Sequence, residues 1–149
     1  MSANGVRHFL DLTDIPKPVL AGLIETGRGM TAVEYARLQT RRASLTGALN
    51  GLLATIDLLL VPVTGTAVWS LEHLAATGRD PEAVAARLRY TAPFDLSGHP
   101  TLTLPGGMTG DGVPTGFQIV GRAFEESTIL AAGHAFQQAS EWHLKRPPL

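Results

Sequence analysis

The sequence predicts an α/β fold in which helices cover a small β-sheet. Three observations support this prediction: a long stretch with helical periodicity, a short apolar run typical of a strand, and two strand-like segments around a glycine-rich loop. The chain has 149 residues, 44% of them hydrophobic and 17% charged, which is the balance of a globular protein. We therefore expect one domain over residues 1–149, with a poorly determined lead-in over residues 1–17.

The clearest helical pattern runs from about residue 32 to residue 55. Thr31 and Glu34 have the spacing of a capping box, in which each side chain accepts a hydrogen bond from the other residue's backbone N–H. The following residues recur at spacings of three and four and define one face of a helix: Tyr35, Leu38, Arg42, Leu45, Leu49 and Leu52. Arg42 is the only charge on this stripe, so its side chain either extends past its neighbours or pairs with a carboxylate from elsewhere.

Four shorter helices are expected from apolar stripes and capping residues. They cover about residues 19–27, 69–76, 80–90 and 125–142. Ser70 is the candidate N-cap of the second. Asp80 followed by Pro81 is a strong start signal for the third, because Asp is preferred at the N-cap and Pro at the first helical position.

Three segments predict the sheet. Residues 56–63 form a continuous apolar run closed by proline, which is typical of a strand buried on both faces. Residues 101–104 alternate between polar and apolar, and residues 115–121 form a further strand. A glycine-rich loop over 106–114 separates these two, so we expect a hairpin whose loop is longer than usual.

Composition excludes several classes of function. The net charge is −1, so we expect no nucleic-acid partner and no anionic membrane partner. The chain has no cysteine, and no two of its five histidines stand three or four residues apart, so we expect no metal and no other cofactor. No segment has the length or apolar character of a membrane span or a secretory signal, which favours a cytoplasmic protein.

Residue patterns alone predict no catalytic residue. The glycine-rich loop joins strand to strand, whereas a dinucleotide-binding loop leads from a strand into a helix, so turn glycines are the better interpretation. Ser97 lies between Asp95 and His99 in the sequence, but members of a catalytic triad come from separate elements. A turn hydroxyl bonded to its own backbone is therefore favoured for Ser97.

A longer pattern is more specific than these short motifs. Its C-terminal portion reads TAPFDLSGHP at 91–100, LTLPGG at 102–107, GVPTGFQIVGR at 112–122 and FEE at 124–126. Upstream, GMTAVEY at 29–35 and DLLLVP at 57–62 belong to the same pattern. In order, spacing and Gly/Pro punctuation this pattern resembles the C-terminal region of the amidase signature family, which includes bacterial amidases and the A subunit of glutamyl-tRNA amidotransferase.

The resemblance implies the C-terminal portion of the amidase signature fold, with a mixed β-sheet covered by helices. Members of that family are much longer hydrolases that cleave amide C–N bonds with a nucleophilic serine, a cis-serine and a lysine. In the family these residues precede the region matched here. No catalytic residue is therefore assigned to this chain, whose only lysines are Lys17 and Lys145. By the same resemblance, four residues are candidates for the acyl-pocket wall: Val63, Thr64, Phe94 and Asp95.

Two hypotheses follow. In the first, the chain corresponds to the C-terminal third of an amidase, completes its sheet and acyl pocket, and is inactive alone. Its partner is then the missing N-terminal part, or a second copy in a homo-oligomer, because a sheet cut from a larger one has an unpaired edge and an apolar face. In the alternative, the chain is a stand-alone, non-catalytic binding or assembly module derived from an amidase.

Overall fold

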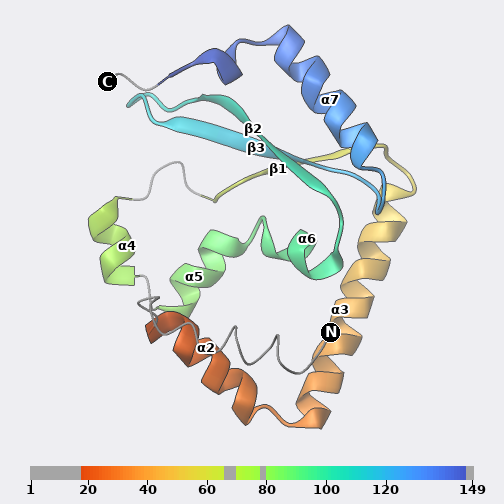
Figure 1. The fold of residues 1–149 in the computed structure, drawn as a ribbon, viewed down its shortest axis with the longest axis vertical. Coiled ribbons are helices and arrows are strands. Elements are labelled where there is room, and N and C mark those ends of the chain that lie inside the picture. Colours follow the sequence, from red (N-terminus) through yellow and green to blue (C-terminus); the bar gives the residue numbers. More distant parts are fainter. Residues whose placement is uncertain (1–17, 66–69, 78–79, 147–149) are drawn as a thin grey trace, which may run out of the picture. The chain divides into compact units, whose positions relative to one another are not determined.

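The structure, a computed structural model, describes residues 18–65, 70–77 and 80–146. The chain divides into two compact units, residues 1–36 and residues 37–149. Helix α2 (Pro18–Gly29) belongs to the first unit, while α3 (Ala32–Leu53) begins in the first and continues in the second (Figure 1). The expected lead-in over 1–17 lies outside the described residues.

The capping box at the start of α3 forms as the spacing predicts. The backbone N–H of Glu34 donates to the Thr31 hydroxyl at 3.2 Å, and the backbone N–H of Thr31 donates to a carboxylate oxygen of Glu34 at 2.8 Å. The Thr31 hydroxyl donates to the same oxygen at 2.7 Å. Two N–H groups that the helix cannot pair internally are thereby satisfied, which places the start of α3 at Ala32.

The apolar stripe of α3 is largely exposed in the structure. Tyr35 is 59% exposed, Leu38 45% and Leu52 44%, while Leu45 and Leu49 are half-buried. The one buried residue of the helix is its last. The stripe therefore lacks a covering layer among the described residues.

The sheet has three described strands in the order β1-β3-β2: β1 (Leu59–Pro62), β2 (Thr101–Met108) and β3 (Pro114–Val120). The expected α/β class and the hairpin are confirmed. Both strand pairs are antiparallel, so the described part of the sheet is antiparallel rather than mixed. The hairpin loop is shorter than expected, because β2 continues through Pro105 and the following glycines to Met108, with an irregular register between Pro105 and Gly107.

The two faces of the sheet have different neighbours. Leu104, Ile119 and Ile129 form a buried cluster between the sheet and helix α7 (Glu126–Ala139), and Phe117 meets Phe136 edge to face at 5.0 Å. Helix α7 lies along this face in Figure 1. Because side chains alternate along a strand, the residues between these apolar positions lie on the opposite face.

Strand β1 is not buried on both faces, contrary to the prediction for residues 56–63. Leu59 and Val61 are half-buried, whereas Leu60 is 64% exposed. Leu60 is paired with Ile119 and so shares the α7 face of the sheet. The continuous apolar run therefore has cover on one face only among the described residues.

The shorter helices begin close to their predicted caps. Helix α4 (Leu71–Thr77) has the backbone N–H of His73 bonded to the Ser70 hydroxyl, and α5 (Pro81–Leu88) has Asp80 accepting from two N–H groups of its first turn. Helix α6 (Ala92–Ser97), expected as part of no element, ends at Gly98, whose φ of 78° favours glycine. The last helix is shorter than expected, since it ends at Ala139 and a 3-10 helix, η1 (Trp142–Leu144), follows.

Two glycines permit the close packing of unit 2. A Cβ at Gly116 would lie 2.9 Å from the carbonyl oxygen of Leu104 on the neighbouring strand. A Cβ at Gly133, in the middle of α7, would overlap the side chain of Leu102. A larger residue at position 133 would therefore require the Leu102 side chain to move away from α7.

The capping box makes a prediction about the ionisation of Glu34. Hydrogen bonds from the Thr31 hydroxyl, and then from its backbone N–H, hold the pKa of Glu34 below its ordinary value. Because this pKa is lowered in the folded chain, the box stabilises the helix above the unfolded-state pKa and loses this effect as pH falls through the lowered pKa.

In Thr31→Val the hydroxyl is lost and the backbone N–H remains. We expect the pKa of Glu34 to rise but to stay below its ordinary value, measured by carboxyl-carbon NMR titration. Thr31→Ser keeps the hydroxyl and is the control, for which the pKa should match that of the parent chain. An unchanged pKa in the valine variant would contradict this account of the cap.

Candidate functional site

The four candidate pocket residues lie on two segments. Val63 and Thr64 follow strand β1, where Val63 is half-buried and Thr64 is exposed. Phe94 and Asp95 lie on α6, where Phe94 is 6% exposed and Asp95 is exposed. Phe94 thus packs inside the unit, while Thr64 and Asp95 are exposed residues.

A buried glutamine connects these two segments. Gln118 on β3 is 3% exposed, and its side-chain nitrogen donates to the carbonyl of Tyr90 at 3.2 Å and to that of Pro62 at 3.5 Å. Pro62 ends β1, and Tyr90 lies just before α6. Beside them, a Cβ built on Gly65 would lie 3.4 Å from the Tyr90 ring. One amide therefore fixes the segment with Val63 and Thr64 relative to the turn that leads into α6.

A second polar group surrounds His99, which is 5% exposed. Its Nδ1 lies 2.8 Å from the Ser97 hydroxyl, and its Nε2 lies 3.0 Å from the side-chain oxygen of Asn50 on α3. Because the amide oxygen only accepts, Nε2 donates its N–H to Asn50. The structure brings Ser97 and His99 together, but Asn50 rather than Asp95 holds the far nitrogen.

The Ser97 hydroxyl also lies 3.3 Å from the carbonyl oxygen of Phe94, as a turn hydroxyl would. The arrangement is a chain of hydrogen bonds that ties the end of α6 to α3. The lone charge on the α3 stripe serves the same connection, since Arg42 donates to the carbonyl of Leu96. Arg42 is exposed and its bond is to a carbonyl, so among the described residues it does not make the predicted pair with a carboxylate.

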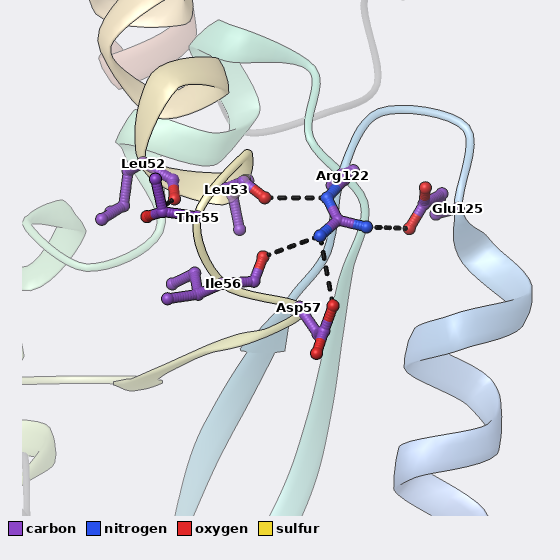
Figure 2. A network of polar contacts seen from close by, with 7 residues as sticks. All are labelled: Leu52, Leu53, Thr55, Ile56, Asp57, Arg122 and Glu125. Carbon is purple, nitrogen blue, oxygen red and sulfur yellow. Dashed lines mark hydrogen bonds and ion pairs between the residues drawn. The ribbon is translucent and has the colours of Figure 1, made fainter.

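The third connection is made by Arg122, which follows β3 (Figure 2). Its Nε donates to the carbonyl of Leu53 at 2.7 Å, and one terminal nitrogen donates to the carbonyl of Ile56 at 3.1 Å. Ion pairs with Asp57 at 3.2 Å and Glu125 at 3.4 Å complete the set. The carbonyl of the last α3 residue has no partner within the helix, so the guanidinium satisfies it and places a positive charge at the negative helix end.

These connections are structural, and the described residues show no cluster suited to metal chemistry. Within residues 18–65, 70–77 and 80–146, no three His, Asp or Glu side chains gather in a group that could hold a metal ion. Of the helices that the structure describes, none combines the length and apolar character needed to cross a bilayer.

A sequence model of the Amidase family matches residues 12–130. The chain belongs to the Amidase family. The match confirms the resemblance to the amidase signature family that the motifs indicated. Among curated relatives, the AmiD protein of Mycobacterium tuberculosis H37Rv, named as a putative amidase, is 42% identical over 132 residues, 89% of this chain and 28% of the relative. The A subunit of glutamyl-tRNA(Gln) amidotransferase from Neisseria meningitidis serogroup B is 34% identical over 91% of this chain and 27% of its own length.

Solved amidase structures agree with this assignment. An amidase crystal structure is 31% identical with a TM-score of 0.64, over 82% of this chain and 28% of the other. A bacterial aryl acylamidase of the amidase signature family is 26% identical with a TM-score of 0.66, over 91% of this chain and 30% of its own. This Amidase-family chain therefore spans less than a third of the length of the relatives that it matches.

Sequence reasoning missed the residues that hold the site together. Asn50, Gln118 and Arg122 bond to groups that lie 28 to 69 positions away in the chain. Gln118 and Arg122 stand inside the quoted family pattern, so the pattern contained them without indicating what they contact. A polar residue in the middle of an apolar strand, as Gln118 is, was the one available signal.

The Arg122 contacts predict that lysine cannot replace arginine here. The Arg122 contacts use three separate guanidinium nitrogens, and the single ammonium nitrogen of lysine cannot occupy all three positions. We expect Arg122→Lys to lower the free energy of unfolding by about 1–2 kcal/mol, measured by urea denaturation, because charged hydrogen bonds to carbonyls are lost. Asp57→Asn is the matched control: the Asp57 side chain is 89% exposed, so the change should be under about 0.5 kcal/mol. Equal effects of the two substitutions would refute the assignment.

Proposed function

We propose that this chain is the C-terminal part of an amidase and is inactive without the rest of the enzyme. The observation that supports this most strongly is the extent of the matches, which cover about 90% of this chain but less than 30% of the curated relatives. By resemblance, the family's serine nucleophile, cis-serine and lysine lie outside the matched region. The chain has no two adjacent serines, and its lysines are Lys17 and Lys145.

In this proposal the chain completes the sheet of the whole enzyme. Among the described strands, β1 and β2 each pair with β3 alone, so each has a free edge to which another strand can bond. The exposed stripe on α3 and the exposed Leu60 on β1 are apolar surfaces that a further layer would cover. The proposed partner is the N-terminal part of an amidase, and a second copy of this chain is the substitute when that part is absent. The cytoplasmic location stays a prediction.

The chain also contributes one wall of the acyl pocket in this proposal. The candidates remain Val63, Thr64, Phe94 and Asp95. Support comes from Gln118, whose amide holds the two segments that carry these residues, because a pocket wall needs such fixed spacing to select an acyl group.

The test is complementation. The purified chain alone should show no hydrolysis of simple amides above a buffer blank. Co-expression with the portion of the M. tuberculosis AmiD protein that precedes the matched segment should give a stable complex that hydrolyses an amide, since the added part would supply the catalytic serines and lysine. In that complex, Thr64→Ala and Asp95→Asn should change KM for substrates that differ in their acyl group, while Arg89→Gln, on an exposed turn, should not.

Amide turnover by the chain alone, with contaminating hydrolases excluded, would overturn the proposal of inactivity. A well-folded chain that neither binds the added part nor gains activity would favour the stand-alone module instead. Unchanged KM values in both pocket variants would remove Thr64 and Asp95 from the pocket while leaving the fragment proposal intact.

A further inference from the structure

A cavity of about 370 Å³ lies where the β2–β3 hairpin meets the end of the described chain. This volume is in the range of sites for small organic ligands. The cavity shares no residue with the four acyl-pocket candidates. Five lining residues belong to the hairpin and four to the end of the described chain: Pro105, Gly107, Met108, Gly112 and Pro114, then Trp142, His143, Lys145 and Arg146.

The walls combine an apolar floor with a cationic rim. Proline rings, a thioether and the half-buried indole of Trp142 provide the apolar surface. Lys145 and Arg146 are exposed at the rim, and none of the lining residues is acidic. Asp111 neighbours the lining Gly112 in the hairpin turn but does not itself line the cavity. The charge at the rim is therefore positive.

Within the described residues, neither cation at the rim has a carboxylate partner. The Arg146 guanidinium is held in place by one nitrogen that donates to the carbonyls of His143 at 3.1 Å and of Lys145 at 3.2 Å. Its remaining N–H groups are free of any bond to a described residue. The rim thus carries a positioned cation with donor capacity left over.

One wall residue also has an unsatisfied polar atom. Nδ1 of His143 is buried and has no hydrogen-bond partner among the described residues. Buried polar atoms are usually paired, so this nitrogen is an exception in a residue that lines the cavity.

We propose that this cavity binds small organic acids that have an apolar body, such as arylalkyl carboxylates. The apolar body packs against Trp142 and Met108, and the carboxylate accepts hydrogen bonds from Lys145 and Arg146. The site would make the chain responsive to free carboxylic acids at a place separate from the acyl pocket. The proposal does not depend on the proposed function, because it concerns this chain alone.

The test uses the full 149-residue chain carrying Trp69→Phe, so that Trp142 is the only tryptophan and reports on the cavity. Titration with 4-phenylbutyrate should give a saturable change in Trp142 emission. The neutral analogue 4-phenyl-1-butanol should bind about fivefold more weakly, the size expected for an ion pair near solvent. Added salt should reduce this difference, because it screens exposed charges.

Lys145→Gln combined with Arg146→Gln should abolish the preference for the acid, whereas Arg89→Gln, an exposed cation away from the cavity, should leave it unchanged. Lys145→Gln alone keeps the Arg146 contacts and should reduce the preference partly, which guards against a local loss of structure in the double variant. Equal binding of acid and alcohol, the absence of saturation, or a preference that survives the double variant would each overturn the proposal.

Discussion

The rest of unit 2 depends on the guanidinium of Arg122. It joins the last carbonyl of α3, the carbonyl of Ile56 and two carboxylates at the point where β3 leads into α7. The helix end, the start of β1 and the turn before α7 are thereby held by one side chain. Gln118 in a similar way joins the end of β1 to the turn before α6, and His99 joins the end of α6 to α3. Polar side chains on β3 and beside the ends of β2 and β3 thus connect the sheet to helices and turns.

Local chemistry explains why part of the fold could be predicted. The Thr31–Glu34 box and the Asp80 cap involve residues within three positions of each other, so their spacing was sufficient. The hairpin loop was predicted too long because glycines at 106 and 107 were interpreted as turn residues, whereas they continue β2 beside an irregular register. For α3, periodicity correctly identified an apolar face, but periodicity does not indicate whether another layer covers that face.

The candidate site was predictable only through resemblance. Residue spacing could not predict that the segment with Val63 is tied to the turn before α6. That connection is made by Gln118, whose hydrogen bonds span 28 and 56 positions. The family match and the uncovered face of α3 support one conclusion from independent directions. The chain carries the packing of an amidase region together with surfaces that its own described residues do not cover. Both the partial match to amidases and the exposed apolar stripe of α3 are expected if this chain is one part of a longer amidase.

Light scattering combined with dye binding tests this central claim most directly. A chain whose α3 stripe lacks cover should have a mass above the 15.8 kDa of one copy, increasing with concentration, or should bind a hydrophobic dye. Leu38→Gln with Leu52→Gln should reduce both signals, because it removes apolar surface from the stripe. A strictly monomeric chain of 15.8 kDa at all concentrations, with no dye bound, would contradict the account.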